Sequence, residues 1–176
     1  MARVKGPEGF RCSQCGAWHD GLPLAYGPEA PIYWYGLTPD ERSTRFVLEP
    51  DYAVLDGQHF FVRGALRIPI HGHDAPFTWV TWVSLSRENY ARFVDPPFAP
   101  EASGNSPMFG WLSSEVEGYP STVNLKAYVH PLPRGQRPLI ELEPTDHPLA
   151  VEQREGITWQ RVQEIAQHVL HGNAGA

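Results

Sequence analysis

The sequence predicts an α+β domain with a largely antiparallel sheet, an N-terminal Cys-x-x-Cys knuckle and a C-terminal amphipathic helix packed on the sheet. Several segments alternate apolar and polar residues with the period of a strand, and one C-terminal segment has the period of a helix. The 18 prolines and 16 glycines indicate short elements joined by turns. A length of 176 residues fits one domain. We expect a flexible leader at 1–9, the domain at 10–172 and a flexible tail at 173–176.

The clearest strand is predicted at 59–70. Its core-facing side carries the apolar residues of the segment, which are Phe60, Val62, Leu66, Ile68 and Ile70. Gly64 interrupts this row, which indicates a bulge or a large neighbour lying over it. Residues 77–86 are apolar on both faces, as is typical of a central strand. Shorter strands are predicted at 45–49, 109–116, 122–129 and 139–143.

The helices are predicted from their capping residues. Thr38 precedes a short helix, Ser86 precedes one over 87–93, and Thr145 or Asp146 precedes one over 149–154. The C-terminal helix follows Thr158 and has a single apolar stripe, made of Val162, Ile165, Ala166, Val169 and Leu170. We expect this stripe to pack on one face of the sheet.

Charge and hydropathy limit which partners the protein is expected to bind and in which cell compartment it is expected to act. The formal net charge is −6, and no run of Lys or Arg could follow a phosphate backbone, so we expect no nucleic-acid partner. No apolar run is long enough to span a bilayer, and the first residues lack the apolar core of a signal peptide. We therefore expect a cytoplasmic protein with no membrane partner. A protein partner is left open, and the oligomeric state is not predicted.

The two cysteines have the spacing of a metal knuckle. Cys12 and Cys15 can turn two thiolates toward one ion, and Gly16 allows the tight turn that this needs. Zinc with a structural role is the cofactor that we predict, with His19 as third ligand. Two alternatives stay open, an ordinary reduced pair and a redox dithiol, although a redox pair normally begins a helix and residues 16–21 do not.

The fourth ligand is predicted to be His171, at the end of the C-terminal helix. An ideal helix places His171 about 160° from the centre of the apolar stripe, which argues against a contact on the buried side. His168 lies nearer the flank of the stripe, and both histidines also suit the negative end of the helix dipole. The predicted ligand set is Cys12, Cys15, His19 and His171.

Other histidines form weaker candidate sites. His71 and His73, followed by Asp74, resemble a hydrolase metal cluster, but a polar loop explains them as well. His147 could be held by Asp146, but this segment also has the character of a helix cap. The sequence contains no nucleophile elbow, phosphate loop or dinucleotide fingerprint, so no catalytic residue is assigned.

Six segments together resemble one known family. They are FRCSQCG at 10–16, HDGLP at 19–23, FFVRG at 60–64, WVSLS at 82–86, FGWL at 109–112 and EPTDHPLAVEQ at 143–153. The chain is similar, over about 10–171, to the bacterial domain-of-unknown-function family numbered 2199. The resemblance implies that the cysteine pair and residues 146–149 belong to the family pattern, and it brings no established activity. Residues 71–74 match no motif of that family.

Three functions follow as hypotheses. The first is a non-catalytic binding or regulatory protein, for example of the immunity type, in which zinc fixes the N-terminal segment to the sheet. The second is a metal-dependent hydrolase or another small-molecule enzyme, which would need several histidines to converge. The third is a thiol redox protein.

Overall fold

The computed structural model describes residues 9–12, 15–19, 21–94, 106–133 and 135–171. Within this part of the chain five strands form a closed barrel, which are β6 (His59–Ile68), β7 (Phe77–Leu85), β8 (Met108–Leu112), β9 (Lys126–His130) and β10 (Leu139–Leu142). Each strand pairs antiparallel with the next, and β10 then pairs with β6 in parallel. The α+β class is confirmed. The prediction of a simple, largely antiparallel sheet is wrong in one respect, because the parallel pairing of β10 with β6 closes the sheet into a barrel.

The barrel closes at Gly64. A Cβ atom at Gly64 would lie 2.5 Å from Cδ1 of Ile140 and 3.0 Å from the carbonyl oxygen of Pro138. That carbonyl accepts a hydrogen bond from the backbone N–H of Ala65 at 2.8 Å. The large neighbour predicted over Gly64 is therefore Ile140 of β10. Glycine is needed here because β10 approaches the backbone of β6 too closely for a side chain.

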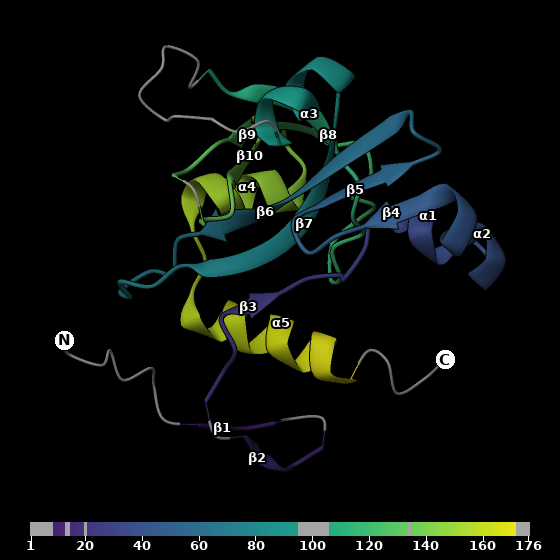
Figure 1. Ribbon diagram of the computed structural model, residues 1–176. Helices are drawn as coiled ribbons and strands as arrows, with labels where there is room; N and C mark the ends of the chain where they lie inside the picture. The colour runs from purple at the N-terminus through teal and green to yellow at the C-terminus, as the bar shows by residue number, and fades with distance from the viewer. Residues whose placement is uncertain (1–8, 13–14, 20, 95–105, 134, 172–176) are drawn as a thin grey trace.

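Three further strands extend the barrel (Figure 1). β5 (Tyr52–Leu55) and β4 (Phe46–Leu48) continue antiparallel from β6. β3 (Ala25–Tyr26) pairs in parallel with the first half of β7. β7 is thus a central strand, as predicted, with neighbours on both edges.

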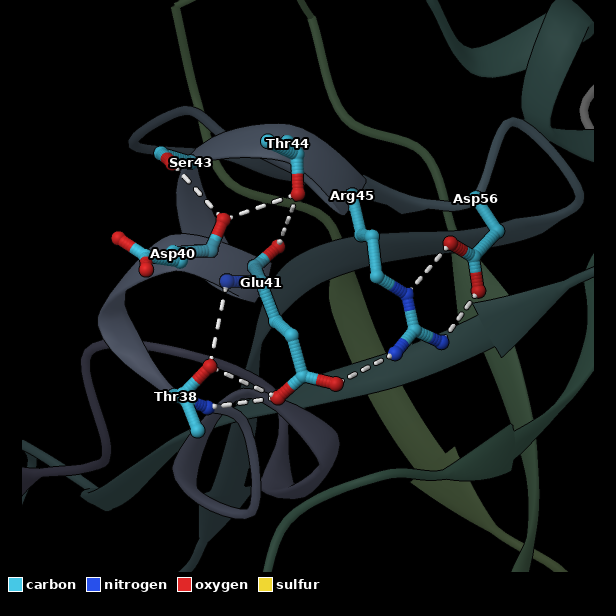
Figure 2. A network of polar contacts seen from close by, with 7 residues as sticks. All are labelled: Thr38, Asp40, Glu41, Ser43, Thr44, Arg45 and Asp56. Atoms are coloured by element: carbon cyan, nitrogen blue, oxygen red, sulfur yellow. Dashed lines mark hydrogen bonds and ion pairs between the residues drawn. The ribbon is translucent and has the colours of Figure 1, made fainter.

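Two short helices, α1 (Ile32–Tyr35) and α2 (Pro39–Arg45), precede β4. Thr38 caps α2 as predicted and forms a capping box with Glu41. Figure 2 shows how Arg45 then joins Glu41 to Asp56, at the tip of the β5–β6 hairpin, at 3.1 and 2.8 Å. The Arg45 guanidinium lowers the pKa of the Asp56 carboxyl, so this exposed pair stays ionised above acidic pH.

Three helices follow β7 in the sequence: α3 (Arg87–Val94), α4 (Pro148–Glu155) and α5 (Trp159–His171). Ser86 and Thr158 accept hydrogen bonds from the first turns of α3 and α5, as predicted. The side chains of Val162 and Ile165 from α5 are buried in the main core with the inward-facing residues of the barrel. Leu170 is 44% exposed and does not belong to the predicted buried stripe.

Three other predictions differ from the structure in detail. The strand predicted at 122–129 begins only at Lys126, because Asn124 has a φ of 66° and the chain turns there. The strand predicted at 109–116 ends at Leu112. The cap of α4 is His147, whose side chain accepts from the Leu149 N–H, and not Thr145 or Asp146. The predicted leader and tail, apart from Gly9, lie outside the described residues.

None of the helices in the described ranges combines the length and the apolar character that crossing a bilayer requires.

Substitution of Gly64 by Ala tests the closure of the barrel. We expect the free energy of unfolding to fall by about 1–3 kcal/mol, because the new methyl group overpacks the contact with Ile140 and Pro138. Urea denaturation measures this. Gly36→Ala is the matched control, since the nearest atom to its Cβ would be 4.0 Å away. Equal stability of the two variants would contradict the assignment of Gly64 as the closure point.

Candidate metal centre

The two cysteines lie in the turn of an N-terminal hairpin. Its strands, β1 (Phe10–Arg11) and β2 (Trp18–His19), pair antiparallel with Phe10 opposite His19. The Cys12 N–H donates to the Ala17 carbonyl, and the Gly16 N–H donates to the Cys12 carbonyl, both at 2.9 Å. Gly16 has a φ of 69°, which confirms the predicted tight turn at this glycine.

Four side chains from the two ends of the chain converge at this hairpin. One potential ligand atom from each of Cys12, Cys15, His19 and His171 lies within 4.8 Å of every other. The Cys12 Sγ is 3.0 Å from His171 Nε2, and the Cys15 Sγ is 3.6 Å from His19 Nε2. The structure therefore brings together all the residues that the sequence predicted as ligands.

Apolar packing supports the cluster on its inner side. Cys12 is 1% exposed and packs with Phe10 and Ala166, and Ala166 belongs to α5. Leu22 and Tyr26 border the same small core. Cys15 is exposed at the outer side of the cluster. The hairpin thus contacts α5 through a small apolar patch as well as through the four polar side chains.

The ring of His19 is held between two others. It stacks on Phe10 with ring centroids 5.3 Å apart and meets His171 edge-on at 6.3 Å. Phe10 lies opposite His19 in the hairpin. Strand pairing and ring stacking therefore both fix the position of the His19 imidazole.

The position of His171 on its helix has a simple explanation. Its side chain lies about 180° around α5 from Val162, which is buried in the main core. In Figure 1 the β1–β2 hairpin lies beside α5 and outside the barrel. Ala166 packs with the hairpin and lies only about 40° around the helix from Val162, so the hairpin contact is not confined to the side opposite the core. His171 is the last described residue of α5, and its side chain joins the cluster from the end of the helix.

The donor set suits a tetrahedral ion. Two sulfurs and two imidazole nitrogens form one of the usual structural zinc sets, for which neighbouring ligand atoms lie about 3.3–3.8 Å apart. The 3.6 Å between Cys15 Sγ and His19 Nε2 falls within this range, and the 3.0 Å between Cys12 Sγ and His171 Nε2 lies just below it. Two thiolates would also balance the charge of a divalent ion, which matters because Cys12 is buried.

The other predicted histidine sites do not assemble. His71 Nε2 lies 2.8 Å from the Glu155 carbonyl oxygen, whereas His73 stacks on Trp159 with centroids 4.8 Å apart. His147 caps α4, and its Nε2 lies 3.3 Å from the Pro120 carbonyl oxygen. Among the described residues, the group at the hairpin is the one cluster of three or more His, Cys, Asp or Glu with metal-binding geometry.

Sequence reasoning missed the neighbours of the cluster. Phe10, Tyr26 and Ala166 position the ligands, but none was expected at the site. The sequence held a signal for Phe10. It is an aromatic residue two positions before Cys12 that belongs to no alternating strand pattern, so its apolar ring needed a packing partner elsewhere. Tyr26 and Ala166 give no such signal, because their role depends on a contact between distant segments.

Comparison with known proteins identifies one family. The family model described as "Uncharacterized protein conserved in bacteria (DUF2199)" matches residues 11–157. Cys12, Cys15 and His19 lie within the matched region, and His171 lies beyond it. No curated protein and no solved structure is significantly similar to the chain. Because the match covers most of its length, the chain belongs to this family of uncharacterized bacterial proteins, DUF2199.

Proposed function

We propose that this protein is a non-catalytic binding or regulatory protein of the cytoplasm, in which a structural Zn²⁺ fastens the N-terminal hairpin to α5. The proposed ligands are Cys12, Cys15, His19 and His171. The observation that carries the proposal is the convergence of four donor atoms within 4.8 Å of one another.

The completeness of the donor set favours a structural role over a catalytic one. Catalytic zinc sites generally use three protein ligands and keep the fourth position for water or substrate. Here the protein offers two sulfurs and two nitrogens, which would fill a tetrahedral shell. Three other histidines that the sequence offered to an enzyme lie apart from one another: His147 caps α4, His73 stacks on Trp159, and His71 lies against the Glu155 carbonyl.

The chemistry of the ligands favours zinc and a reducing compartment. Mixed thiolate and imidazole sets with tetrahedral geometry are typical of zinc. Cys12 and Cys15 are not joined in a disulfide. Reduced thiols of this kind are typical of the cytoplasm. The formal charge of −6 would favour a basic protein partner electrostatically.

Elemental analysis tests the proposed ligands. We expect about one equivalent of zinc in the purified protein and little in the variants Cys12→Ser and Cys15→Ser, because thiolates are the strongest ligands of the set. His19→Ala and His171→Ala should retain zinc only weakly under competition by a chelator. His168→Ala, an exposed histidine on the last turns of α5, is the control and should keep the parent zinc content. A zinc content that is unchanged in Cys12→Ser would contradict the proposal.

Removal of the metal should loosen one part of the fold. Chelation is expected to expose the backbone N–H groups of Cys12 and Gly16 to hydrogen exchange, because the hairpin would open locally. Amides in the paired region of β6 and β7 should keep their protection, since the barrel core does not involve the metal. Hydrogen exchange read by NMR or mass spectrometry measures both. A hairpin indifferent to chelation would refute a structural role for the ion.

A further inference from the structure

A cleft of about 470 Å³ lies beside the middle of β7. The first half of β7 pairs with β3 at Tyr26–Trp79, and its last residues pair with β8 from Val83 onward. After β3, Gly27 still lies against the backbone of Val80, and after β8 the Ser113 N–H donates to the Trp82 carbonyl, so that the cleft borders β7 at Thr81. Its walls come from β3, β7, the segment after β8 and the last turns of α5, and the residues that matter here are Tyr26, Trp79, Thr81, Glu115, Glu117 and Val169.

Two buried hydroxyl groups line this cleft without a partner. Thr81 is 1% exposed, and its Oγ1 has no hydrogen-bond partner in the part of the chain that the structure describes. The same is true of the Tyr26 hydroxyl. Burial raises the pKa of this phenol, so it remains protonated and able to donate. Buried hydroxyls without partners destabilise a fold, and an ordered water or a bound ligand is what supplies the missing hydrogen bonds at such places.

The mouth of the cleft is acidic. Glu115 and Glu117 are both exposed at its edge. The Glu115 carboxylate is held in place, because it accepts from the Ser121 hydroxyl at 2.7 Å and from the Thr122 N–H at 3.1 Å. Two carboxylates at the entrance repel anions and accept hydrogen bonds from hydroxyl or ammonium groups.

The remaining wall is aromatic and aliphatic. Trp79 is 3% exposed, and Tyr35, Val116 and Val169 also line the space. Aromatic rings offer flat apolar surfaces against which the C–H face of a ring-shaped ligand can pack. The cleft volume lies within the range of small-molecule sites, about 300–1,000 Å³.

From these features we infer that the cleft binds a small polyhydroxylated molecule, neutral or positively charged, of the sugar or amino-sugar class. Its inner hydroxyls exchange hydrogen bonds with Tyr26 and Thr81, which can each donate and accept. Its outer hydroxyl or ammonium group donates to the carboxylates of Glu115 and Glu117. The same two carboxylates weaken the binding of a sugar acid.

The cleft adjoins the proposed metal centre. Tyr26 packs against the small core that includes Cys12, and Val169 precedes His171 by two positions on α5. The inference does not require the metal, because the two unpartnered hydroxyls belong to β3 and β7. Failure of zinc binding and failure of sugar binding are therefore separate results.

Titration of the full-length protein with D-glucosamine, D-glucose and D-glucuronate, followed by NMR or calorimetry, tests the inference. We expect saturable millimolar binding of glucosamine and glucose, and affinity for glucuronate that is lower by about 10-fold or more. Tyr26→Phe and Thr81→Val should each weaken glucosamine binding by about 10-fold, because each removes one hydroxyl and keeps the shape. Without sugar, Thr81→Val should melt at the same or a higher temperature, since it removes a buried hydroxyl with no partner.

Thr78→Val and Tyr33→Phe are the matched controls. Thr78 lies on the opposite face of β7 from Thr81, and Tyr33 is 42% exposed on α1. Both variants should bind glucosamine like the parent. The inference is overturned if no sugar binds, if glucuronate binds as well as glucosamine, or if Thr81→Val and Thr78→Val bind equally. It is also overturned if crystals soaked in glucosamine show only ordered water on the two hydroxyls.

Discussion

The arrangement of the N-terminal region depends on one contact between residues 159 positions apart, between Cys12 and His171. The β1–β2 hairpin has strands of two residues each, and its apolar contact with α5 is limited to a small group around Phe10. A hairpin of this size is at best marginally stable in water. An ion shared between the hairpin and α5 would supply the missing free energy, because metal binding is coupled to the ordering of its ligands.

The closed barrel determines where this contact and the adjacent cleft can form. Gly64 lets β10 return to β6, and the closed sheet leaves the first half of β7 free to pair with β3. α5 then packs on the main core through Val162 and Ile165 and on the hairpin through Ala166. The same helix contributes Val169 to the cleft and His171 to the metal centre. Both proposed sites are therefore consequences of how α5 and β3 lie against the barrel.

Local patterns predicted the elements but not their closure. Alternation predicted β6, and capping residues predicted α2, α3 and α5, because these features depend on near neighbours in the chain. The spacing of Cys12 and Cys15 predicted their convergence for the same reason. β10 pairs in parallel with β6 at Leu139 and Ala65, and this pairing produces no periodic pattern in the sequence. Only Gly64 hinted at it. The sequence analysis also overlooked Thr81, which places a hydroxyl among the core-facing residues of an apolar strand and so indicates a polar contact there.

X-ray absorption at the zinc edge on the purified 176-residue protein tests whether the two ends of the chain hold one ion. A shell of two sulfurs at about 2.3 Å and two imidazole nitrogens at about 2.0–2.1 Å is the predicted result. His171→Ala should lose one imidazole from this shell, and His168→Ala should not change it. A shell made mainly of oxygen, or one that His171→Ala leaves unaltered, would contradict the claim that the two ends of the chain hold one ion.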